Sequence, residues 1–180
     1  IACNTAIAQE GMHGDYGANI GKVIAIRKDL PSLLKAYAAA GSDARMNGCE
    51  LPVVINSGSG NQGLTVSVPL IIYAEREHLD KEKLYRALVI SNLTAIHLKT
   101  EIGRLSAFCG AVSAGAACGA GLAYLKDASE EVMNHTIVNA LAITSGIICD
   151  GAKASCAAKI AVSVEAGILG YDMYMNGQQF

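Results

Sequence analysis

The sequence predicts a mainly α-helical domain. Its apolar residues recur at three- and four-residue spacing in four or five segments of helical length, and most of these segments follow a helix-capping residue. The period-two alternation typical of half-buried strands is scarce. The 180 residues suffice for one ordinary domain, and no internal repeat or linker divides them. We therefore expect a single domain over residues 1–180, built from helices packed on helices.

The first part of the chain predicts turns followed by one clear helix. Glycines punctuate the first segment of the chain, through Gly11, Gly17 and Gly21, and this pattern is typical of loop and turn. Asp29 then provides an N-cap and Pro31 an early proline. A helix is therefore expected from Asp29 to Gly41.

Residues 51–73 contain the less certain elements. The apolar run LPVVIN at 51–56 indicates a short strand or a buried extended segment. The glycines of residues 57–63 then mark a loop whose backbone approaches something closely. The run 64–73 fits either a strand or a buried helix, and we favour the helix.

The second half of the chain predicts further helices. Asp80 caps the first of them, and an uncharged run rich in small residues, 105–125, forms the next. Ser129 begins another, with two glutamates in its first turn, and this helix ends near Gly146. After a short break the helical pattern resumes over residues 152–174.

The uncharged run 105–125 has enough length to span a membrane, which takes about 20 residues. It consists mostly of Ala, Gly, Ser and Cys, with few large aliphatic residues. Within it, residues 115–119 present small residues at both ends, a pattern that lets helices approach closely. We therefore expect a buried core helix rather than a transmembrane helix.

Composition limits the classes of partner and compartment. Hydrophobic residues make up 52% and charged residues 17% of the chain, compared with roughly 25% charged residues in typical soluble domains. The chain is therefore expected to bury much of its surface in its core, in a partner or against sequence outside these residues. A net charge of -2 argues against nucleic-acid binding. No signal peptide is visible, so we expect a cytoplasmic protein with free thiols.

Three cysteines, Cys109, Cys149 and Cys156, stand among glycine, alanine and serine residues. Their separations of 40 and 7 positions match neither the cysteine spacing of zinc ribbons nor that of ferredoxins. On spacing alone, such cysteines are more often inert core residues than ligands. If they did bind a four-iron cluster, three thiolates would leave one iron open to substrate.

Four segments carry a resemblance to a known family. Residues 10–17, 56–63, 104–109 and 148–156 resemble the iron-sulfur L-cysteine desulfidase family, which is related to the α chain of bacterial L-serine dehydratase. The resemblance covers nearly all of the chain and implies a helical serine-dehydratase-alpha-like domain. It also implies a lyase that uses an oxygen-sensitive [4Fe-4S] cluster, which aerobically prepared protein is expected to lose.

The resemblance implies roles for particular residues. The cluster ligands match Cys109, Cys149 and Cys156, while Cys118 matches no ligand position and is expected to be a packing residue. The substrate loop matches Ser57, Gly58, Ser59, Gly60, Asn61 and Gln62. Backbone amides in this loop, with its serine and asparagine side chains, could bind an α-carboxylate; a tight structural turn is the alternative. Cys3 and Cys49 stay unassigned.

Other polar residues are candidates without a fixed role. Lys99 and Arg104 could bind the substrate carboxylate or flank the cluster, or they could form ordinary ion pairs at a helix end. His13 and His97 are candidates for an acid or base, with a structural helix histidine as the alternative for His97. The catalytic base is not identified, because the Cys-Thr-Glu-Pro motif that the family associates with proton transfer is absent here.

The resemblance predicts a lyase domain that eliminates the β-substituent of L-cysteine, giving pyruvate, ammonia and sulfide. One alternative is L-serine dehydration. Another is a non-catalytic assembly module whose cysteines bind structural zinc or nothing. The expected partners are a small amino-acid substrate, a missing N-terminal part of the same protein and a second copy in a homo-oligomer. We expect a C-terminal fragment that is inactive alone.

Overall fold

The computed structural model describes residues 1–103, 106–149 and 151–180, and these form eight helices. The prediction of a mainly α-helical fold is confirmed. The helices are α1 (Ala2–His13), α2 (Ile20–Ala25), α3 (Leu30–Met46), α4 (Gly60–Arg76), α5 (Lys81–Thr100), α6 (Gly110–Leu125), α7 (Glu130–Ile143) and α8 (Cys156–Met175).

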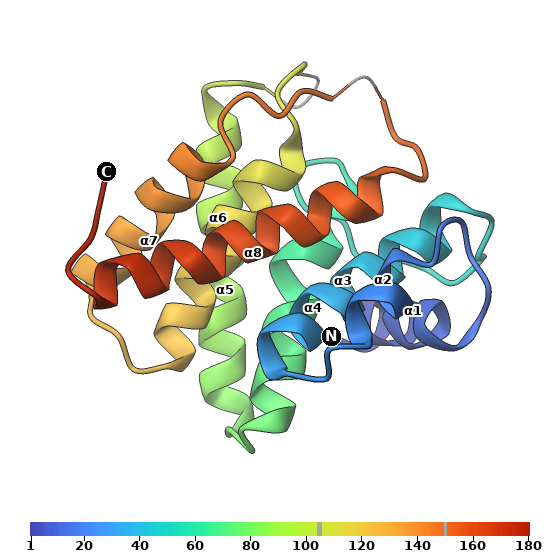
Figure 1. The fold of residues 1–180 in the computed structure, drawn as a ribbon, viewed down its shortest axis with the longest axis horizontal. Helices are drawn as coiled ribbons and strands as arrows, with labels where there is room; N and C mark the ends of the chain where they lie inside the picture. Colours follow the sequence, from blue (N-terminus) through green and yellow to red (C-terminus); the bar gives the residue numbers. More distant parts are fainter. Residues whose placement is uncertain (104–105, 150) are drawn as a thin grey trace.

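The helices pack around α6, which contacts α4, α5, α7 and α8. The long helix α8 crosses the front of the molecule and also contacts α3 and α7 (Figure 1). The N-terminal helices α1, α2 and α3 form a group at one side, with α4 joining them to the centre. Within the described ranges, no helix combines the length and the hydropathy that crossing a membrane requires.

Several helices begin at the residues that the sequence predicts. The side chains of Asp29, Asp80 and Ser129 each accept a hydrogen bond from a backbone amide in the first turn of α3, α5 and α7. The expected end of α3 at Gly41 is wrong, since the helix continues to Met46. Gly41 instead provides room for the neighbouring Leu64 side chain, whose methyl carbon would lie 3.1 Å from an added Cβ.

The prediction of loop and turn for the first segment, through Gly21, is only partly right. Helix α1 runs through Gly11 to His13, and α2 begins at Ile20. A Cβ on Gly11 would lie 2.0 Å from the carbonyl oxygen of Ala40, so this glycine permits a close helix crossing. Gly17, with φ of 56°, does occupy a turn. Sequence alone did not distinguish these two uses of glycine.

The expected strand or buried segment at 51–56 is also wrong. The described residues contain no β-ladder here, only an isolated bridge between Asn56 and Ser59. Val54 and Ile55 are 55% and 61% exposed. The following run, 64–73, is helical as favoured and lies within α4, almost entirely buried.

The small residues of α6 allow a close crossing with α8. A Cβ on Gly115 would lie 2.3 Å from the carbonyl oxygen of Ser163, and one on Gly167 would lie 2.6 Å from that of Gly115. Gly119 also faces Gly167. The helix predicted within 105–125 is thus a buried core helix, and its small residues let the two backbones touch.

Candidate functional site

A short backbone pairing brings two of the three candidate cysteines together. The Cys109 amide donates to the Ile147 carbonyl at 3.2 Å, and the Cys149 amide donates to the Ala107 carbonyl at 2.7 Å. Phe108 and Ile148 form an antiparallel bridge between these bonds. We call this pairing of residues 107–109 with 147–149 the clasp. It explains how residues 40 positions apart reach one site.

The third cysteine, Cys156, is the first residue of α8. Its sulfur accepts a hydrogen bond from the Lys153 backbone amide at 3.4 Å. The helix that the sequence predicts over residues 152–174 is present as α8, but it begins at Cys156 rather than at residue 152. Cys109 and Cys156 are buried and Cys149 is half-buried. All three line one cavity of about 440 Å³.

The pKa of Cys109 is set by its position among these groups. Burial raises the pKa of this thiol above its usual range, and a hydrogen bond from the Ala111 amide lowers it. The nearby thiols of Cys149 and Cys156 raise the pKa further, while the Lys159 ammonium lowers it. These three groups affect the pKa of Cys109 because they line the same cavity.

Three helices point their N-terminal ends at this cavity. Its lining includes residues from the first turns of α4, α6 and α8. Helix N-termini carry partial positive charge and unpaired amide donors, so they favour anions. Three cationic side chains, Arg45, Lys99 and Lys159, add to this potential. Among the described lining residues there is no aspartate, glutamate or histidine.

Most residues of the predicted substrate loop reach the cavity. Ser57, Gly58, Ser59, Asn61 and Gln62 line it. The Ser59 hydroxyl accepts from the Gln62 amide at 3.4 Å and thereby caps α4. The Asn56 and Ser59 backbones exchange two hydrogen bonds across Ser57 and Gly58, so the loop forms a tight turn, as the alternative interpretation expects.

Asn61 is held in one orientation by two neighbours. Its side-chain oxygen accepts hydrogen bonds from Ser42 and from the Arg45 guanidinium, both at 3.2 Å. No described residue pairs with its side-chain nitrogen. Gly60 lies behind this group, where an added Cβ would be 2.4 Å from the Arg45 side chain. The glycine therefore makes room for Arg45. The sequence did not predict Arg45 as a residue of this site.

Two further side chains carry polar atoms that the described residues leave without partners. Lys99 is 4% exposed, and its ammonium makes no hydrogen bond or ion pair within the described ranges. Gln62 is 6% exposed, and its Oε1 atom is buried without a donor. Gly110 lies against Gln62, where an added Cβ would be 2.4 Å from Nε2. Leaving such groups unmatched is unfavourable by about 1–3 kcal/mol each, and water or a ligand bound in the cavity would satisfy them.

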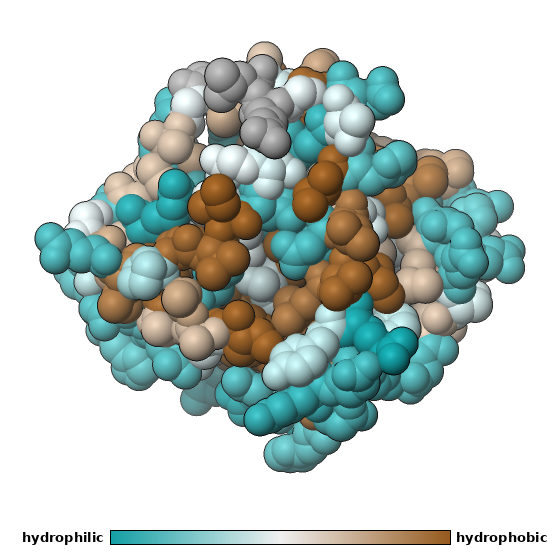
Figure 2. All heavy atoms as spheres, turned by 180° about the vertical axis from the view of Figure 1, so that it is seen from behind, coloured by the Kyte–Doolittle hydropathy of each residue, from teal (hydrophilic) through white to brown (hydrophobic). Residues whose placement is uncertain are grey.

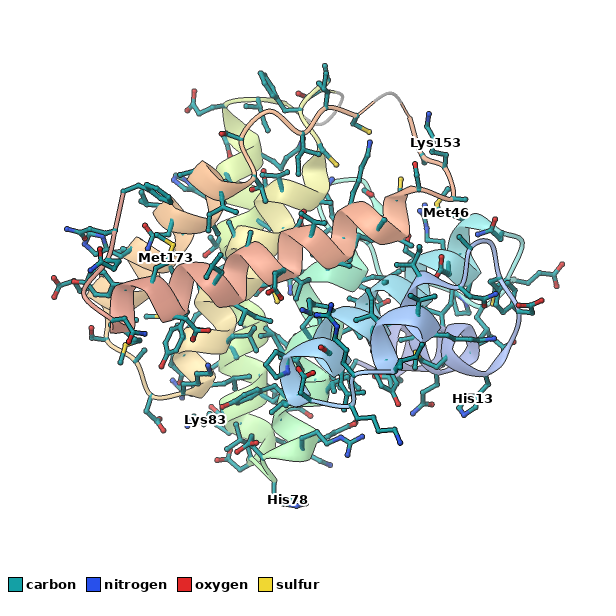
Figure 3. The ribbon with its side chains drawn as sticks, in the orientation of Figure 1. His13, Met46, His78, Lys83, Lys153 and Met173 are labelled. Atoms are coloured by element: carbon teal, nitrogen blue, oxygen red, sulfur yellow. The ribbon has the colours of Figure 1, made fainter. Side chains whose placement is uncertain are left out.

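The remaining candidates lie elsewhere. His13 is exposed at the outer end of α1, far from Lys153 and the start of α8 (Figure 3), and contacts the Gln9 carbonyl. His97 is exposed on α5 and does not line the cavity. Arg104 lies outside the described residues.

The other three cysteines are separate from the cavity. Cys118 is fully buried in the core, and burial raises the pKa of its thiol. Cys3 and Cys49 are half-buried and do not line the site. Across the part of the chain that the structure describes, no three His, Cys, Asp or Glu side chains are arranged to hold a single metal ion.

Fold and site together define a helical domain with a thiol-lined cavity whose cations and helix N-termini favour anions. The chain belongs to the serine dehydratase alpha chain family, whose model matches residues 1–180. Membership supports an amino-acid lyase-type domain.

Curated relatives carry a family designation rather than an activity. The chain is 63% identical to a UPF0597 protein of Desulfitobacterium hafniense (strain Y51), covering 100% of this chain and 42% of that protein. It is 56% identical to a UPF0597 protein of Lachnoclostridium phytofermentans, covering 100% of this chain and 44% of that protein. It is 42% identical to the UPF0597 protein YhaM of Escherichia coli O1:K1 / APEC, covering 91% of this chain and 39% of that protein. The chain thus spans about two fifths of these relatives. No solved structure matches it.

Proposed function

We propose that this domain holds a [4Fe-4S] cluster on Cys109, Cys149 and Cys156 and contributes to the β-elimination of L-cysteine to pyruvate, ammonia and sulfide. The observation that carries the proposal is the convergence of three thiols and three helix N-termini on one cavity. Family membership supports the coarser lyase assignment.

The donor set fits a cluster with three protein sulfurs. Burial raises the pKa of the Cys109 thiol, and the Lys159 ammonium acts in the opposite direction. Cys109 and Cys156 also stand at the N-terminal ends of α6 and α8, where helix dipoles favour thiolates. A cluster spaces its sulfur ligands more widely than a single ion does. When bound, it would supply an open iron acting as a Lewis acid toward the leaving thiol.

The polar groups of the cavity suit both charged ends of an amino acid. Arg45, Lys99 and the free amide nitrogen of Asn61 can donate hydrogen bonds to an α-carboxylate. The unpartnered Oε1 of Gln62 can accept one from the α-ammonium. Burial strengthens these bonds. These residues bind and orient; none of them is assigned as the base that removes the α-proton.

L-serine is the second candidate substrate. The family description names serine dehydratase, and a hydroxyl leaves the same β-carbon that a thiol does. Gln62, Arg45 and Lys99 would bind the shared α-amino-acid part of either substrate, so their arrangement does not discriminate between the two. The discrimination must come from what contacts the β-substituent.

Anaerobic reconstitution with iron and sulfide tests the cluster. We expect the protein to take up about four irons per chain and to gain visible iron-sulfur absorbance. Cys149→Ser should lose this absorbance, while the matched variant Cys118→Ser should keep it, because Cys118 lies in the core away from the cavity. Equal uptake by both variants would refute the ligand assignment. Zinc binding without iron uptake would support the non-catalytic module.

Product analysis in the full-length protein tests the reaction. We expect sulfide, ammonia and pyruvate from L-cysteine in equal amounts. Gln62→Met removes the buried acceptor while keeping the side-chain volume, and should raise KM for the amino acid about tenfold or more, since one buried bond to a charged group contributes about 1.5–3 kcal/mol. Ammonia from L-serine without sulfide from L-cysteine would establish the second candidate instead.

A further inference from the structure

Helix α5 carries an exposed apolar stripe on the side away from the core. Tyr85, Val89, Leu93 and Ile96 are 49%, 56%, 60% and 48% exposed. Their spacing of four, four and three residues places them on one face of the helix. We call this set the α5 stripe.

The same helix is apolar on its opposite side. Leu84, Ala87 and Ala95 are buried, and α5 packs against α4 and α6. A helix that is apolar on both sides is typical of a buried position, whereas one at the periphery usually presents a polar face to solvent. The α5 stripe therefore has the composition of an interface.

The stripe continues to the candidate site. Ile55 and Ile96 both line a second cavity of about 460 Å³, which shares Lys99, Ser57 and Gly58 with the thiol-lined cavity. Ile55 and its neighbour Val54 are themselves exposed, at 61% and 55%. Figure 2, viewed from behind, shows apolar side chains on both sides of a hollowed centre, framed by hydrophilic ones. Helix α5 lies on this side, behind α8 in Figure 1.

We propose that the α5 stripe, with Val54 and Ile55, binds the part of the polypeptide that the relatives have beyond the matched region. This chain covers only 42% to 44% of the first two relatives, so more than half of each relative lies outside the matched region. A segment in the same polypeptide has a high effective concentration, which favours it over a second copy as the occupant. Such docking would close the second cavity beside Lys99.

The docked segment would lie beside the thiol-lined cavity, whose lining shares Lys99 with the second cavity. Among the described lining residues of the thiol-lined cavity the cations are present, but a carboxylate or imidazole is not. The segment that covers the α5 stripe is therefore in a position to carry a base for α-proton removal. The docking itself follows from the exposed apolar surface and does not depend on iron binding.

Site-specific photo-crosslinking in the full-length protein tests the proposal. A photoreactive phenylalanine analogue at Leu93 should link to peptides of the same chain outside the 180 residues, as mapped by mass spectrometry. The control position is Val23 on α2, whose exposure of 60% equals that of Leu93. Cross-links from Leu93 to a second copy of this region, or yields no higher than those from Val23, would overturn the proposal.

A second variant separates docking from folding. With the photoreactive group at Ile96, the double substitution Val89→Asp/Leu93→Asp should reduce the intramolecular cross-link several-fold. Val23→Asp/Ile26→Asp places the same charges on exposed apolar residues elsewhere and should leave it unchanged. An unchanged yield in the α5 variant would refute the assignment. Iron uptake, measured on the same samples, reports on the cluster independently.

Discussion

Replacing Gly115 by alanine tests whether the crossing of α6 and α8 depends on backbone contact. The new Cβ would lie 2.3 Å from the Ser163 carbonyl oxygen, about 1 Å closer than the ordinary contact distance of 3.4 Å. Because the obstacle is backbone, the two helices must separate. Overpacking of this kind destabilises by about 1–3 kcal/mol, and we take the upper end. Alanine has a higher helix propensity than glycine, which offsets about 1 kcal/mol of this loss.

The expected net loss for Gly115→Ala is therefore about 2 kcal/mol, which lowers Tm by about 4–8 °C in a chain of this size. Thermal unfolding followed by circular dichroism measures it. Gly41→Ala is the matched control, because it also lies within a helix but meets the mobile methyl groups of Leu64 at 3.1 and 3.3 Å. Its Tm should stay level or rise. A Gly115→Ala protein as stable as Gly41→Ala would refute the packing argument.

Three further outcomes are expected. In native, metal-free protein, a thiol reagent should label Cys149 rapidly and leave Cys118 unmodified until unfolding, because Cys118 is fully buried. The hydrogen bond that the Tyr16 hydroxyl donates to the Glu10 carboxylate raises the pKa of Tyr16 from 10.0 to about 12. This bond therefore stabilises the fold below pH 10, and its contribution is lost as the pH rises through about 12. Ultraviolet titration of Glu10→Gln should show a lower pKa for Tyr16. Asn139→Ala removes two hydrogen bonds of a buried amide and should lower the free energy of unfolding by about 1–3 kcal/mol in urea titrations.

Local signals in the sequence were sufficient for much of the fold. The caps at Asp29, Asp80 and Ser129 are local hydrogen-bonding patterns, so the starts of α3, α5 and α7 could be predicted correctly. The small residues around Gly115 similarly indicated a close helix crossing. The exposed run at 51–56 was mistaken for buried structure because its apolar pattern does not reveal whether a partner covers it.

The candidate site depends more on tertiary contacts. Arg45 lies at the end of α3, and nothing in its local sequence marks it as a cavity residue; only the packing of α3 against α4 places it beside Asn61. His13 was a candidate acid or base in an expected loop, because the glycines around it suggested turns. Gly11 instead serves a helix crossing, which carries His13 to the outside. Glycines therefore gave a wrong prediction of turns at positions where the glycine is needed for close helix packing.

The clasp has a consequence for how this region can vary. It closes a segment of about forty residues, containing α6 and α7, at its two ends. Changes in length at the turn between these helices, around residues 126–129, therefore need not move Cys109 relative to Cys149. Loop lengthening is thermodynamically mild, about 0.6 kcal/mol per doubling. A reporter peptide inserted at this turn should accordingly leave the positions of the Cys109 and Cys149 thiols relative to each other unchanged.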